Sequence, residues 1–340
     1  MCWSRGPIRT AAAGALLMAT VGCQWQADRP SNAASPRVEA LTVADRPRDW
    51  LALPNTVTSV KFAVIGDSGR GWKPQHDVAA TMARYRERFA FSFVVMLGDN
   101  IYEGPASAHD YRVKFEHPYR ALLDAGVRFF AVLGNHDDPR QRDYAPFNMG
   151  GERYYSFTPP ADLLSQLGTR VRFFAVDSTS IDGAQLAWLG RTLEQSDARW
   201  KICLLHHPLY SPGRYRTQAR LLRWRLESLF VQHGVDAVFS GHEHFYARSL
   251  PLGGIVYFIS GAAGSLRRGE ASSVPEFARS FDRDFHFMLI EIDGDTLHFQ
   301  AIARSGRTVD AGSVRQAPGI GALPLTKDSS VLPRSPGLSP

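Results

Sequence analysis

Cysteine, net charge and long hydrophobic runs are all scarce in this chain of 340 residues, although 44% of its residues are hydrophobic. It has three cysteines, at positions 2, 23 and 203, a number and spacing that exclude a disulfide framework. No segment beyond the N-terminus is apolar enough to cross a bilayer. The formal charge of +6 is too weakly basic to favour a nucleic-acid partner. The composition is that of an ordinary globular protein with one large domain or two small ones.

The first 22 residues are expected to be an export signal. Arg5 and Arg9 precede the uncharged stretch Ala11–Val21, which is too short to span a bilayer. We therefore expect the mature protein outside the cytoplasm, in the periplasm or the cell envelope. Gly22 and Cys23 resemble a bacterial lipoprotein cleavage site, which would place a lipid anchor on Cys23. Thr20 departs from that pattern and fits ordinary signal cleavage, so both routes stay open.

Short apolar runs separated by helix-like stretches predict an α/β fold. The runs end at turns or polar clusters and are typical of buried strands: Phe62–Ile65, Phe93–Leu97, Phe129–Leu133, Val171–Val176, Ile202–Leu205, Ala237–Phe239 and Ile255–Ile259. The helix-like stretches are His76–Arg88, Asp110–Ala125, Gly183–Gln195 and Gln218–His233. This alternation places the functional residues on loops past the carboxyl ends of the strands.

The C-terminal part of the predicted domain looks antiparallel, which makes the sheet system mixed. Phe285–Ile292, Thr296–Arg304 and a short segment at Val309 form this part. Residues 23–57 show no sustained period and are predicted to be a tether, and residues 311–340 are predicted to be a disordered tail. A single domain over residues 58–310 is therefore expected.

Seven residues with metal-ligand chemistry lie at the ends of these runs. They are Asp67, Asp99, Tyr102, Asn135, His206, His242 and His244. Carboxylates, imidazoles, an amide and a phenolate together could hold two metal ions a few ångströms apart. Glycines at positions 66, 98, 134 and 241 immediately precede four of them and permit sharp exits from the strands.

The order of these motifs resembles the purple acid phosphatases within the calcineurin-like metallophosphoesterases. Gly-Asp-x-Gly, Gly-Asp-x-x-Tyr, Gly-Asn-His-Asp, a histidine two residues before Pro208, and Gly-His-x-His follow one another between about Phe62 and Gly264. The compact length is similar to the small, tartrate-resistant type. The resemblance implies a β-sandwich of two mixed sheets flanked by helices, in α/β/β/α layers.

One exchange of residues makes the resemblance more specific. Many metallophosphoesterases have Asp-x-His at the first motif, whereas Gly69 stands at that position here and Tyr102 follows the second aspartate by three residues. A phenol with a reference pKa of ~10 binds as phenolate only to a strong Lewis acid, which favours ferric iron.

Carried over by position, the resemblance assigns ligands to two ions. The ferric site takes Asp67, Tyr102 and His244, and Asp99 bridges the two ions. The second site takes Asn135, His206 and His242 and would hold divalent iron, zinc or manganese.

The implied reaction is hydrolysis of phosphate monoesters with an acid optimum. Two cations would clamp the ester oxygens and lower the pKa of a bound water, so that hydroxide attacks in line. His136 is the catalytic candidate that would orient the phosphate and protonate the leaving alkoxide. A phosphodiesterase or nucleotidase on the same scaffold is one alternative. An exported binding protein that has lost activity is another.

His207 and Glu243 are sequence neighbours of the expected ligands. Strand alternation turns His207 away from the face of His206, so His207 is interpreted as a rim residue or a hydrogen-bond partner of a ligand. The same alternation predicts an outward, solvated Glu243 between its two histidines. Arg214 and the pair Arg267-Arg268 are the candidates for gripping an anionic substrate.

Overall fold

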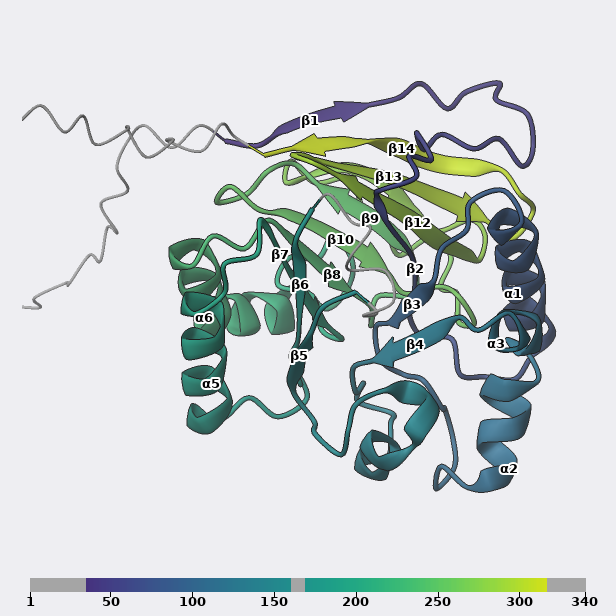
Figure 1. The fold of residues 1–340 in the computed structure, drawn as a ribbon, viewed down its shortest axis with the longest axis horizontal. Helices are drawn as coiled ribbons and strands as arrows, with labels where there is room; N and C mark the ends of the chain where they lie inside the picture. Colours follow the sequence, from purple (N-terminus) through teal and green to yellow (C-terminus); the bar gives the residue numbers. More distant parts are fainter. Residues whose placement is uncertain (1–34, 160–168, 317–340) are drawn as a thin grey trace, which may run out of the picture. The chain divides into compact units, whose positions relative to one another are not determined.

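The computed structural model describes residues 35–159 and 169–316. The expected signal, Cys23 and residues 317–340 of the expected tail lie outside the described residues. In the described part, two seven-stranded mixed sheets form the centre of the domain (Figure 1).

The first sheet contains three parallel strands beside a run of antiparallel ones. In spatial order its strands are β1 (Arg37–Ala40), β14 (Thr308–Arg315), β13 (Thr296–Ala303), β12 (His286–Asp293), β2 (Val60–Ile65), β3 (Phe93–Met96) and β4 (Arg128–Ala131). Strands β2, β3 and β4 run parallel, with Phe62 paired to Phe93 and Phe93 paired to Arg128. Their carboxyl ends therefore meet at one edge of the sheet.

The second sheet has the same mixed character. In spatial order its strands are β11 (Phe277–Phe281), β9 (Tyr246–Ser249), β10 (Val256–Ser260), β8 (Ala237–Ser240), β7 (Trp200–Leu205), β6 (Val171–Ala175) and β5 (Tyr155–Phe157). Strands β6, β7, β8 and β10 are parallel, and β5, β9 and β11 pair antiparallel.

The sheets pack face to face and helices cover their outer faces (Figure 1). Aromatic side chains fill the space between the sheets: the ring of Phe62 lies 5.2 Å from those of Phe93 and Phe173. The helices are α1 (Lys73–Arg86), α2 (Ala108–Tyr111) and α3 (Arg120–Asp124) on one side, and α5 (Gly183–Glu194) and α6 (Arg216–Gln232) on the other. The predicted α/β/β/α layering is confirmed.

The predicted helix over Asp110–Ala125 is interrupted. After α2 the chain forms a π-helix over Arg112–Glu116 and then a turn before α3 begins. Pro118 lies in that turn, and proline has no backbone N–H to donate to an α-helix.

The predicted limits of the domain are too narrow at both ends. Strand β14 continues to Arg315, so the predicted tail is wrong for residues 311–315. Strand β1 lies within the predicted tether and pairs antiparallel with β14, where Val38 is opposite Val314. The domain therefore includes segments from both expected flanks.

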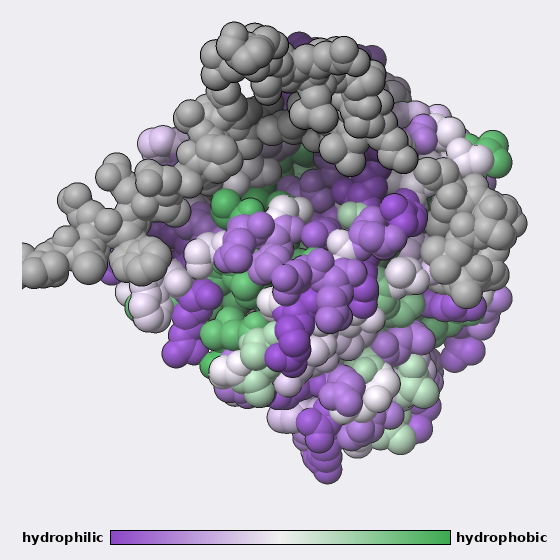
Figure 2. Space-filling view, turned by 60° about the vertical axis from the view of Figure 1, so that its left-hand side comes forward, coloured by the Kyte–Doolittle hydropathy of each residue, from purple (hydrophilic) through white to green (hydrophobic). Residues whose placement is uncertain are grey.

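The face on which α6 lies is mostly hydrophilic, with scattered hydrophobic patches (Figure 2). Leu221 and Trp224 of α6 are among the exposed hydrophobic residues. No helix in the described ranges is long and apolar enough to cross a membrane.

Candidate metal centre

The seven predicted ligands come together where the parallel strands of both sheets end. Asp67 follows β2, Asp99 follows β3, and Asn135 follows β4 in the first sheet. His206 follows β7, and the loop from β8 to β9 carries both His242 and His244. Asp67 and Asp99 have the left-handed φ values 53° and 52°, a backbone conformation that aspartate adopts more readily than most residues other than glycine.

The first group of donors is a triangle formed by Asp67, Tyr102 and His244. The Tyr102 hydroxyl lies 3.2 Å from Asp67 Oδ1 and 3.2 Å from His244 Nε2, and His244 Nε2 lies 3.2 Å from Asp67 Oδ1. Neighbouring donors on one ion with bonds of ~2.1 Å are separated by ~3 Å. The triangle therefore has the size needed to hold one ion.

The second group is centred on the Nε2 atom of His206. That atom lies 3.0 Å from Asn135 Oδ1, 3.2 Å from His242 Nδ1 and 3.4 Å from Asp99 Oδ1. Asp99 also interacts with the hydroxyl of Tyr102, which belongs to the first triangle. Its carboxylate is therefore placed between the two groups of donors.

Hydrogen bonds behind the site turn the lone pairs of two histidines toward these groups. His206 Nδ1 lies 2.8 Å from the carbonyl oxygen of Leu97, to which it donates, so its Nε2 carries the free lone pair. His242 Nε2 lies 3.2 Å from Gln218 Oε1, an acceptor, so His242 presents Nδ1. The two imidazoles are held in the tautomers that metal coordination requires.

The protonation states of the buried donors suit a cation. Burial lowers the pKa of His242 to about 2 and that of His244 to about 3, so both rings are neutral over the ordinary pH range. Burial raises the pKa of Asp67 well above its usual value, because its negative charge has lost its solvation. A bound cation would supply the missing compensation, and the donor set fits a two-metal centre.

Gly69 is packed directly against the segment that carries Tyr102. Its N–H donates to the carbonyl of Asp99 at 3.1 Å, and its own carbonyl accepts the N–H of Tyr102 at 2.9 Å. A Cβ at position 69 would overlap the Asn100 carbonyl and lie 2.5 Å from Ile101 N. A side chain at position 69 would therefore force the Asn100–Ile101 peptide away from Gly69, and this peptide leads directly to Tyr102.

The sequence of this chain is similar to known phosphatases over most of the domain. The calcineurin-like phosphoesterase family matches residues 60–246. Purple acid phosphatase 17 of Arabidopsis thaliana is 30% identical over 245 residues, which cover 64% of this chain and 72% of that protein. The chain belongs to the purple acid phosphatases of the calcineurin-like phosphoesterase family.

Solved structures share the fold of this purple acid phosphatase. A purple acid phosphatase from yellow lupin matches with a TM-score of 0.60 and 18% identity, over 77% of this chain and 54% of that one. GAP50, an anchor in the inner membrane complex of Plasmodium, matches with a TM-score of 0.65 and 17% identity, over 77% of this chain and 90% of that one. At these identities the two structures support the fold alone.

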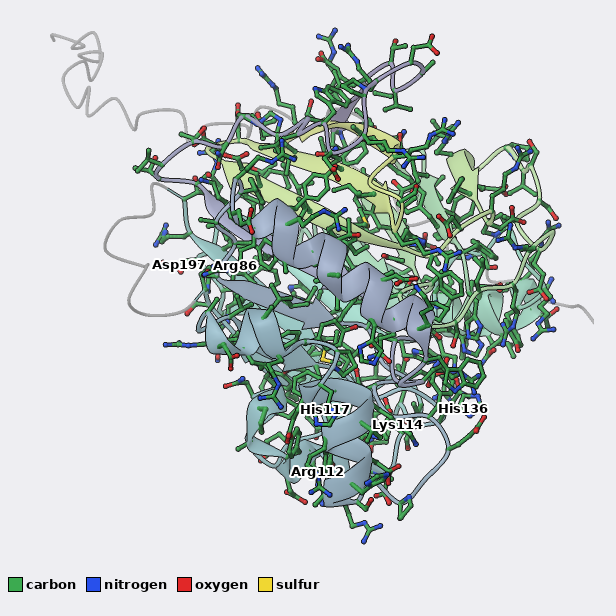
Figure 3. All side chains as sticks on the ribbon, turned by 90° about the vertical axis from the view of Figure 1, so that its right-hand side faces the viewer. Arg86, Arg112, Lys114, His117, His136 and Asp197 are labelled. Carbon is green, nitrogen blue, oxygen red and sulfur yellow. The ribbon has the colours of Figure 1, made fainter. Side chains whose placement is uncertain are left out.

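His136 is exposed on the loop after β4 (Figure 3). Its backbone N–H donates to Asp99 Oδ1 at 3.0 Å, and its ring lies 5.0 Å from that of Tyr102. The loop therefore places an imidazole beside the predicted metal site with open access to solvent.

His207 is buried behind the second group of donors. Its Nδ1 lies 3.0 Å from Ser178 Oγ, and its ring lies 4.4 Å from that of His242. His206, His207 and His242 are close enough to hold an ion by themselves. His206 has the stronger position as a ligand, because it is the one that also lies against Asn135 and Asp99.

The expectation for Glu243 is wrong, because this side chain is fully buried. It accepts hydrogen bonds from Ser211 Oγ and from the N–H of Tyr215. Strand alternation fails here because the segment between β8 and β9 is a turn, in which His242 has a φ of 66°. The sequence also gave no sign of Gln218, which reaches His242 from α6.

Proposed function

We propose that this protein is an exported phosphatase that hydrolyses phosphate monoesters at a ferric–divalent binuclear centre. Asp67, Tyr102 and His244 would hold the ferric ion, and Asp99 would bridge the two ions. The divalent ion would be held by Asn135, His206 and His242. The observation that carries the proposal is the 3.2 Å triangle in which the hydroxyl of Tyr102 meets a carboxylate and an imidazole.

Tyr102 is the reason for proposing iron. The hydroxyl of Tyr102 is buried, and burial raises the pKa of this phenol, so it stays protonated without a cation. A ferric ion is a strong enough Lewis acid to take the proton's place. The neutral donors Asn135, His206 and His242 suit divalent iron, zinc or manganese at the second position.

The residues around the ions have separate tasks. When bound, the two metals would neutralise phosphate charge and lower the pKa of a coordinated water. His136 is free to face a substrate and is proposed to orient the phosphate and protonate the leaving oxygen. An acid optimum is part of the proposal, because a bound ferric ion would lower the pKa of a coordinated water more than a divalent ion would.

Arg267 is proposed to assist in holding the anionic substrate. Its backbone N–H donates to the carbonyl of His244 at 3.1 Å, and its Nη1 is buried without a partner among the described residues. Arg214 is less suited to this task, because its side chain is 52% exposed and lies 3.4 Å from Glu270.

Turnover of three substrate classes tests the proposal. The purified, iron-loaded protein should hydrolyse a phenyl phosphate monoester faster than the corresponding diester or a nucleotide. Preference for the diester or the nucleotide would support the alternative enzyme, to which the same metal ligands are equally suited. If the protein had its full metal content and hydrolysed none of the three substrates, the result would support the binding-protein alternative.

Export requires its own experiment, since residues 1–22 lie outside the described residues. Expression of the full chain with a radiolabelled fatty acid would distinguish a lipid on Cys23 from ordinary signal cleavage. Recovery of the unprocessed chain in the cytoplasm would contradict export by either route.

A further inference from the structure

We propose that Arg70 is a positioning residue that tunes the electronic state of Tyr102, and with it the colour and reduction potential of the iron. This inference rests on the proposed function, because it requires Tyr102 to bind iron as a phenolate. The guanidinium carbon of Arg70 lies 3.8 Å from the centroid of the Tyr102 ring. This contact places a cation on the ring of a proposed metal ligand.

Arg70 is held in this position from several directions. Its Nη1 donates to Glu103 Oε1 at 2.6 Å, and its Nε donates to Ser265 Oγ at 3.1 Å. The ring of Trp72 lies 5.1 Å from the guanidinium carbon. The side chain of Arg70 is 19% exposed, so its charge is only partly screened by solvent.

A cation over an aromatic face attracts the π electrons of the ring. In a phenolate bound to ferric iron, those electrons move to the metal when the complex absorbs visible light. The positive charge of Arg70 lowers their energy, so the transition requires more energy and the band lies at shorter wavelength. A positive charge near the iron also favours the reduced ion and raises the reduction potential.

The carboxylate of Glu103 has the opposite effect, since it pairs with Arg70 and carries a negative charge. Its side chain is 76% exposed, so solvent screens it more than Arg70. Lys114, labelled in Figure 3, is a second cation near Tyr102. It donates to the backbone carbonyl of Tyr102 and pairs with Asp110 at 2.8 Å. Arg70 contacts the ring itself.

Two single substitutions should move the band in opposite directions. In iron-loaded protein, Arg70→Gln should shift the visible maximum to longer wavelength and lower the reduction potential. Glu103→Gln should shift the maximum to shorter wavelength and raise the potential, by smaller amounts. The double variant should lie between the two single variants, since each change offsets the other. Misfolding would not produce shifts of opposite sign.

The controls separate charge from packing. Arg70→Lys keeps the charge and should shift the band less than Arg70→Gln does. Arg140 pairs with Asp138 at 2.6 Å as Arg70 pairs with Glu103, and it donates to the carbonyl of Pro105, so Arg140→Gln should leave the band in place. Iron content is measured for every variant and should equal that of the wild type.

Unmoved bands in both variants, or shifts of the same sign, would overturn the role of Arg70 while leaving the ferric centre intact. A wild-type protein that binds iron without colour would overturn the phenolate centre itself and this inference with it. The two failures are therefore distinguished by the wild-type spectrum alone.

Discussion

Substitution of Gly69 by alanine should damage the metal centre without touching a ligand. A Cβ at this position would lie 2.5 Å from Ile101 N and would overlap the carbonyl of Asn100. Non-bonded heavy atoms at optimal separation are ~3.5–4 Å apart, so the Asn100–Ile101 peptide would have to move by roughly 1 Å or more. The two residues that flank this peptide are Asp99 and Tyr102.

The size of the effect follows from that displacement. Overpacking at a buried position costs ~1–3 kcal/mol of unfolding free energy. A misplacement of ~1 Å in a catalytic group can lower the rate ~100-fold. We therefore expect Gly69→Ala to lower kcat/KM for a phosphate monoester by about two orders of magnitude, together with a weaker visible band.

Urea unfolding, iron content and steady-state kinetics measure these effects. Gly183→Ala is the matched control, because a Cβ at that glycine meets nothing within 4 Å. It should leave stability, iron content and kinetics close to wild type. If Gly69→Ala matched this control in all three measurements, the steric role of Gly69 beside the Asn100–Ile101 peptide would be refuted.

Three further predictions concern a proton donor, a buried acid and a buried ion pair. His136→Ala should lower turnover ~10²–10⁴-fold with metal content unchanged; an equal loss of metal would make His136 a ligand. Burial raises the pKa of Asp236 from 3.8 to about 6, so the native state holds this proton over a pH range in which the unfolded state has lost it. The free energy of unfolding therefore falls as pH rises through this interval. Asp236→Asn should abolish that loss. Urea unfolding at pH 4 and pH 7 measures it, and an equal change in the free energy of unfolding between the two pH values in wild type and variant would contradict the prediction. Asp310 pairs with Arg248 at 2.7 Å, both nearly fully buried, so Asp310→Ala should cost ~3–5 kcal/mol in thermal unfolding, and a cost below ~1 kcal/mol would contradict the pairing.

The central strands could be predicted because they are buried on both faces. Every residue of β3 and of β8 is buried, and such strands appear in the sequence as continuous apolar runs. The edge strands β1 and β11 lack this signal, because they consist of exposed and half-buried residues. In β14, Gly312 looks like part of a disordered tail, yet it packs so closely on β1 at Glu39 that a Cβ would not fit.

The seven residues that meet at the site could be predicted, because each stands in a short motif that follows a strand. The residues that contact them from other elements could not, since those contacts arise from tertiary packing. Gln218 reaches His242 from α6, and Arg70 reaches Tyr102 across a loop. Strand alternation predicts the wrong side for Glu243, because this segment is a turn in which the left-handed residue before it changes the direction of the next side chain.

The visible spectrum of iron-loaded protein, compared between wild type and Tyr102→Phe, tests the central claim most directly. The hydroxyl of Tyr102 lies 3.2 Å from both of its partner donors, and the substitution removes that oxygen while keeping the ring. We expect a visible band in the wild type and none in the variant at equal iron content. A band that survives unchanged in Tyr102→Phe would contradict the assignment of Tyr102 to the ferric ion.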